Sequence, residues 1–251
     1  MSKNEVANTA NQMPDYIKQN ATRGSEEVGL DDITIPRIDV LQDLSPQIKK
    51  SKSEYIEGAE AGVLFNTLTG ELYPDGIQIL PIYFRKNWLV WKDQNKGGGL
   101  RGIYDNQAEA EQFIATQEDA GDLEAVETAE NIVYIIDADG GFQEAAFSLS
   151  KSKLKINRKF NSLVRLQGGD RFSRVYSVRA VDASNAAGQD YYNVAVDYAE
   201  GGDGAPVWPT EEQYMAAELL YDNISSGKRE VKVDSGAAAS SDDGGKVADE
   251  F

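Results

Sequence analysis

The sequence predicts a β-rich α+β protein with one domain and two flexible ends. Two observations predict it: dense runs of β-branched and aromatic residues separated by Gly, Asp and Pro turns, and polar low-complexity sequence at both ends. The 251 residues are 41% hydrophobic, which supports a real core. We expect a flexible arm over residues 1–30, a single domain over 31–224 and a disordered acidic tail over 225–251.

The strand signals are apolar runs bounded by turns. Residues 31–41 supply the first apolar anchors, among them Ile35 and Ile38. The later strand segments are 61–92, a hairpin over 129–150 that turns at Asp139-Gly140-Gly141, and two alternating segments at 171–183 and 188–199.

Helical segments are fewer and lie between these strands. Residues 105–117 form the clearest mid-chain helix, with Asp105 or Asn106 as its N-cap. Residues 157–166 predict a short helix, and 209–223 predict another that opens with a capping box made by Thr210 and Gln213.

Composition excludes several classes of chemistry. The chain has no cysteine and no histidine, so thiol nucleophiles, thiolate metal sites and imidazole bases are absent. We therefore expect a binding protein and not an enzyme, with no catalytic residues, no metal and no cofactor. No apolar run is long enough for a signal peptide or a membrane span, so we expect a cytoplasmic protein without a membrane partner.

Positive charge is concentrated in two short segments of an acidic chain. The net charge is −17, yet residues 151–179 carry +8 and residues 83–104 carry +4. The remainder is therefore much more acidic than the average suggests. Random solvated surfaces rarely separate charge in this way, so the two segments predict a surface for an anionic ligand.

Aromatic residues are interleaved with both basic segments. Cations follow phosphates and rings stack on unpaired bases, so this pattern is typical of single-stranded nucleic-acid binding. We expect Lys151, Lys153 and Lys155 to project from one face of a strand. The predicted phosphate contacts are Arg85, Lys86, Lys92, Arg101, Lys151, Lys153, Lys155, Arg158, Lys159 and Arg174, and the predicted stacking residues are Trp88, Trp91, Phe160 and Tyr176.

The tail ends with the sequence "KVADEF", an aromatic residue beside two acids. An acidic tail can occupy a cationic groove until nucleic acid displaces it, and a terminal carboxylate next to an apolar ring is a compact peptide ligand. The predicted partner-binding residues of the tail are Asp242, Asp243, Asp249, Glu250 and Phe251.

An acidic, Phe-terminated tail resembles that of the replicative single-stranded DNA-binding proteins of bacteria and tailed phages. The segments "DDITIPRIDVLQDLSP", "ILPIYFRKNWLVWKD" and "GGGLRGIYD" are also similar to a group of phage early proteins. The resemblance covers roughly residues 30–200. It implies an OB-like antiparallel barrel, non-specific binding of single-stranded DNA, and tail contacts with replication, recombination or transcription proteins. A homo-oligomer is compatible with it.

Three alternatives remain open. An acidic decoy that mimics DNA explains the net charge but has no use for two basic segments. A metal-dependent nuclease using Asp137, Asp139 and Glu144 is weakly supported, because acids are abundant and "DADGG" is typical of a turn. A virion structural protein predicts a stable oligomer without salt-sensitive DNA affinity.

Overall fold

The computed structural model describes residues 24–29, 32–185 and 188–233. The strands are β1 (Thr34–Ile35), β2 (Arg37–Val40), β3 (Leu64–Asn66), β4 (Leu72–Tyr73), β5 (Ile77–Lys92), β6 (Leu100–Tyr104), β7 (Leu123–Ile136), β8 (Phe142–Ser150), β9 (Tyr176–Ser184), β10 (Asp190–Tyr198) and β11 (Lys232–Val233). The helices are α1 (Gln107–Ala115), α2 (Leu154–Gln167) and α3 (Glu211–Ser225), with 3₁₀ turns η2 (Pro46–Ile48), η3 (Gln94–Lys96), η4 (Ala120–Asp122) and η5 (Lys151–Lys153).

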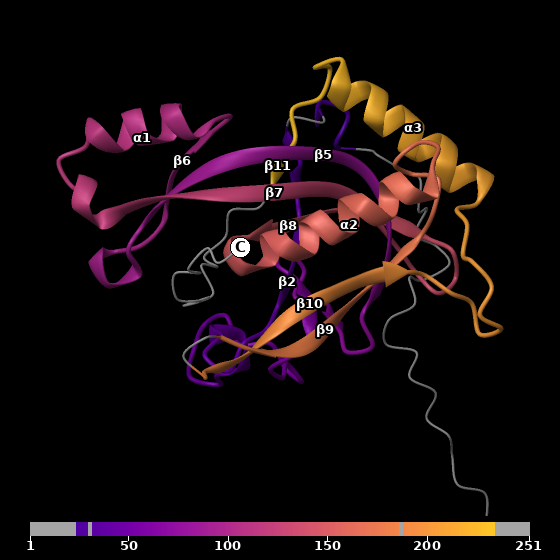
Figure 1. The fold of residues 1–251 in the computed structure, drawn as a ribbon, viewed down its shortest axis with the longest axis horizontal. Helices are drawn as coiled ribbons and strands as arrows, with labels where there is room; N and C mark the ends of the chain where they lie inside the picture. The colour runs from indigo at the N-terminus through magenta and orange to yellow at the C-terminus, as the bar shows by residue number, and fades with distance from the viewer. Residues whose placement is uncertain (1–23, 30–31, 186–187, 234–251) are drawn as a thin grey trace, which may run out of the picture.

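Most strands belong to one curled sheet that forms a half-barrel (Figure 1). Its order is β10-β9-β5-β7-β8-β2-β3-β4, and β6 pairs with β5 outside this path. The ladders are antiparallel except for β2 with β8 and the separate pair β1 with β11. The β-rich, OB-like α+β class predicted from the sequence is therefore confirmed, although the sheet is not wholly antiparallel.

The two faces of the sheet carry two separate cores. Alternation along β5 places Ile79 in one cluster and Leu80 in the other. The first cluster includes Phe160 of α2 and buried residues of β9 and β10, whereas the second includes Leu220 of α3. α2 contacts both β8 and β10, which the curl of the sheet brings together, so α2 fills the inner side and α3 covers the outer side. The first cluster is therefore the inner core, and the second is the outer core.

The predicted helix starts match the structure. Asn106 is the N-cap of α1 and accepts a hydrogen bond from the backbone N–H of Glu109. Thr210 and Gln213 form the reciprocal capping box of α3. In the described part of the chain, no helix has the length and apolar character needed to cross a membrane.

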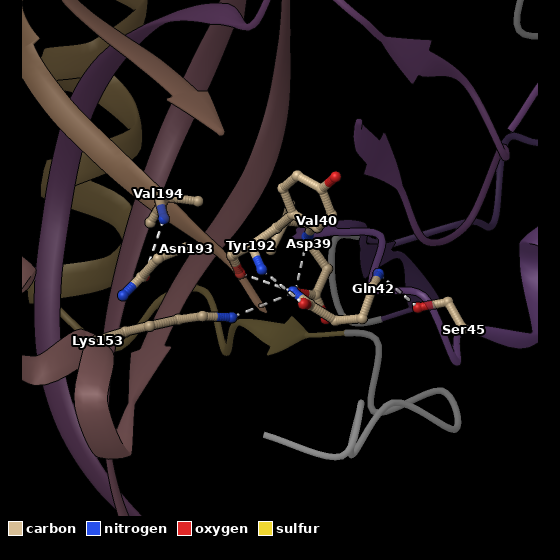
Figure 2. Close-up of polar contacts among 8 residues, drawn as sticks. All are labelled: Asp39, Val40, Gln42, Ser45, Lys153, Tyr192, Asn193 and Val194. Carbon is tan, nitrogen blue, oxygen red and sulfur yellow. Dashed lines mark hydrogen bonds and ion pairs between the residues drawn. The ribbon is translucent and has the colours of Figure 1, made fainter. Parts of the chain in front are cut away.

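A glutamine closes the open side of the half-barrel. The side chain of Gln42, just after β2, donates to the backbone carbonyl of Tyr192 over 2.7 Å and accepts from its N–H over 2.9 Å (Figure 2). The amide thus makes the two hydrogen bonds with Tyr192 of β10 that a neighbouring strand would make. Close packing accompanies it, because a Cβ on Gly62 would lie 2.6 Å from the Tyr192 ring.

We expect Gln42→Leu to lower the free energy of unfolding by about 2 kcal/mol, because it leaves a part-buried backbone N–H and carbonyl without partners. Urea denaturation measures the change. Gln78→Leu is the matched control, since Gln78 is exposed on β5. Equal effects of the two substitutions would show that the Gln42 bonds do not close the sheet.

Candidate nucleic-acid interface

The exposed side of α2 is the strongest cationic surface among the predicted sites. Lys155, Arg158, Lys159 and Arg165 are exposed and recur at helical spacing, so they lie along one face of the helix. No acid occurs in α2. Lys159 pairs with Asp197 over 2.5 Å. The other three form no ion pair with any acid in the described ranges, which leaves their charge available to an external anion.

Lys151 and Lys153 do not lie on a strand, so the predicted strand face with Lys155 is wrong. β8 ends at Ser150, and the chain turns into η5 and then α2. The turn gives Lys151 a left-handed φ of 49°. Lys151 pairs with Glu124 over 3.3 Å. Lys153 lies 3.8 Å from Asp39 of β2, and the two side chains are only 12% and 15% exposed, so Lys153 is largely withdrawn from solvent (Figure 2).

Phe160 and Tyr176, predicted to stack on bases, are buried in the inner core. Both side chains are almost inaccessible, and their rings meet edge to face at 5.2 Å. Burial is also the main reason that the pKa of Tyr176 is raised to about 12. Neither ring presents a face to solvent, so this packing contradicts their assignment as stacking residues.

Arg174 forms an aromatic stack near the C-terminal end of α2. Its guanidinium lies 3.9 Å from the ring centre of Tyr198 and 5.5 Å from that of Trp208. Its Nη1 donates to the side chain of Gln167, the last residue of α2, over 2.8 Å. Trp208 is 54% exposed. An exposed indole thus lies near the C-terminal end of α2, linked to it through Arg174.

Sequence reasoning missed Trp208. It lies in the segment "GGDGAPVWPT", and no alternation marks this segment as a strand. The usable signal was a tryptophan between two prolines in a glycine-rich loop, because a large apolar residue in an exposed loop is commonly part of a binding surface.

The basic residues of β5 and β6 are largely paired with acids of β7 and of the loop that precedes it. Arg85 contacts Glu130 over 2.6 Å, Lys86 contacts Glu127 over 2.7 Å, and Lys92 contacts Asp119 over 2.5 Å; Arg101 lies 3.7 Å from the same Asp119. Arg85 also donates to the backbone carbonyl of Val231. Exposed pairs such as that of Lys86 contribute little to stability and can exchange an acid for a phosphate, whereas Arg85 is a structural residue.

Trp88 and Trp91 are half-buried on β5. Phe84 packs in the inner core, and alternation beyond it places Lys86 and Trp88 on the same inner side of the sheet. The ladder to β7 pairs Trp88 with Glu127 and Trp91 with Glu124, which places the two indoles on opposite faces. Trp88 is therefore the one that shares the side of α2.

The structure continues past residue 224, where the sequence predicts the tail to begin. Arg229 is buried and forms a bidentate pair with Glu144, at 2.8 and 2.5 Å. Val231 is buried in the outer core, and β11 pairs with β1. The predicted partner-binding residues, Asp242, Asp243, Asp249, Glu250 and Phe251, lie outside the described residues.

These features define a β-rich α+β protein whose curled sheet carries a cationic helix on its inner side. The chain matches the model of the Pam3 phage gp34-like protein family over residues 4–230 and belongs to that family. No curated protein and no solved structure matches it. The family description names a phage and no activity.

Proposed function

We propose that the protein binds single-stranded DNA without sequence preference and acts in phage replication or recombination, with no catalytic step. One observation supports this most: α2 presents four exposed basic side chains and contains no acidic residue, in a chain of net charge −17. A uniformly acidic surface would repel a phosphate backbone, so affinity depends on this strip.

Exposed and half-exposed rings favour a single strand over a duplex. Trp208 lies against Arg174, which bonds the last residue of α2, and Trp88 lies on the inner side of β5. Stacking on such rings requires bases that are not already stacked within a duplex, and each stacked base contributes about 1–3 kcal/mol. The lysine and arginine side chains of α2 would then contact the phosphates of the same strand.

The acidic tail supplies the regulation in this proposal. Residues 234–251 include Asp234, Asp242, Asp243, Asp249 and Glu250 against a single Lys246. Eighteen residues span at most about 60 Å, so the tail can reach round from β11 to the inner side. We propose that it competes with DNA for α2 and that displaced Phe251 recruits replication, recombination or transcription proteins.

The test is a fluorescence titration of the full-length protein and of a version ending at Val233, with oligothymidine and with the matching duplex. We expect quenching by the single strand only, with tighter binding when the tail is removed. About five engaged phosphates give a slope of log affinity against log salt near −3.5. A salt-independent affinity would contradict the electrostatic part of the proposal, and no binding by either form would reject it.

An acidic DNA mimic is the second candidate, and α3 is the observation that favours it. Glu211, Glu212, Glu218 and Asp222 are exposed along α3 on the outer side of the sheet. A mimic would bind a host DNA-handling enzyme through this helix and would not bind oligothymidine. The same titration therefore separates the two functions.

A further inference from the structure

Arg171, in the loop between α2 and β9, inserts its side chain between α2 and β5. The guanidinium carbon lies 5.3 Å from the ring centre of Phe84 on β5 and 5.4 Å from that of Phe160 on α2. Its Nη2 donates to the amide oxygen of Asn131 over 2.6 Å and to that of Asn161 over 3.0 Å. The head group is thus fixed by two aromatic rings and two neutral amides.

No acid in the described part of the chain compensates this charge. Arg171 forms no ion pair there, and its buried Nε has no hydrogen-bond partner. Burial lowers the pKa of Arg171 to about 10. Arg229 shows the usual arrangement, because its buried guanidinium holds Glu144 through both Nη atoms. A largely buried cation without a counter-ion is costly, so Arg171 needs an explanation beyond packing.

The position of Arg171 supplies that explanation. Asn161 ties it to α2, and Phe84 ties it to the stretch of β5 that also carries Lys86 and Trp88 on the inner side. Arg171, a member of the second basic segment, therefore lies between α2 and the basic part of β5. A strand that contacted both α2 and Lys86 would pass this guanidinium.

We propose that Arg171 is a phosphate-binding residue between α2 and β5, preset to receive one phosphate of a bound strand. This inference rests on the proposed function. A guanidinium recognises phosphate through paired N–H donors, and Arg171 Nη1 makes no hydrogen bond with any described residue. A fixed, partly desolvated guanidinium binds phosphate more strongly than a mobile surface lysine, since little ordering remains to be done on binding.

The test compares Arg171→Met, Arg171→Lys and Arg229→Met in the full-length protein, with oligothymidine as the probe. We expect Arg171→Met to weaken affinity at least about tenfold and to reduce the magnitude of the salt slope by about 0.7. Arg171→Lys keeps the charge, so it retains the slope while losing part of the affinity. Arg229→Met leaves Glu144 unpaired, which lowers the melting temperature without changing the slope.

An unchanged slope and affinity in Arg171→Met, when the unaltered protein binds oligothymidine, would overturn the inference and leave the proposed function intact. Inorganic pyrophosphate provides a second test of the Arg171 site, one that does not require the protein to bind a DNA strand. We expect it to raise the melting temperature of the unaltered protein and of Arg229→Met more than that of Arg171→Met. If oligothymidine does not bind at all, the proposed function fails, and equal pyrophosphate shifts in all variants would then overturn the Arg171 site as well.

Discussion

Phe160→Ala is expected to lower the free energy of unfolding by about 3–5 kcal/mol, because it removes a fully buried ring from the middle of the inner core. The ring packs edge to face against Tyr176 and lies against the guanidinium of Arg171. Neighbouring side chains relax only partly into such a space, so a cavity remains. Urea denaturation followed by far-UV circular dichroism measures the change.

Trp208→Ala is the matched control, because Trp208 is an aromatic residue that is 54% exposed. Its removal should cost little stability and should weaken oligothymidine binding, as expected for a stacking residue. The opposite result for Phe160→Ala, an unchanged stability with weakened binding, would show that its ring is accessible to a base after all. The pair of variants thus separates core packing from strand contact.

Local signals predicted most of the strands and helices. The hairpin at Asp139-Gly140-Gly141 joins β7 to β8, and the caps at Asn106 and Thr210 begin α1 and α3. Each of these features depends on residues within a few positions of one another, so the local sequence is enough to predict it. Neither the curl of the sheet nor its closure by Gln42 has such a signal, because Tyr192 is 150 residues away.

The candidate interface was predicted in its charge but not in its geometry. Alternating lysines fit a strand, yet Ile156, Phe160 and Leu163 recur at helical spacing and pack inward, and this period indicates a helix. α2 has no side-chain N-cap, so the usual start signal was absent. Whether an aromatic residue is exposed or fills a core depends on tertiary contacts, which is why the burial of Phe160 and Tyr176 and the exposure of Trp208 were not predicted.

Reversing the charge of α2 is expected to have the largest effect on binding. The triple change of Lys155, Arg158 and Arg165 to Glu should weaken oligothymidine affinity more than a hundredfold at low salt, and three lost phosphate contacts reduce the magnitude of the salt slope by about 2. The same protein should fold normally, because these side chains are exposed and form no ion pair with described acids. A glutamate at 155, in the first turn of α2, also interacts favourably with the helix dipole.

A matched control separates a local site from a general charge effect. Changing Lys49, Lys50 and Lys52 to Glu alters the net charge equally, in the loop between η2 and β3. We expect this variant to bind oligothymidine with a nearly unchanged salt slope. Equal weakening in both triples would show that overall charge, and not the face of α2, governs affinity. Loss in the α2 triple alone, with unfolding free energy unchanged or raised, would assign the phosphate contacts to that helix.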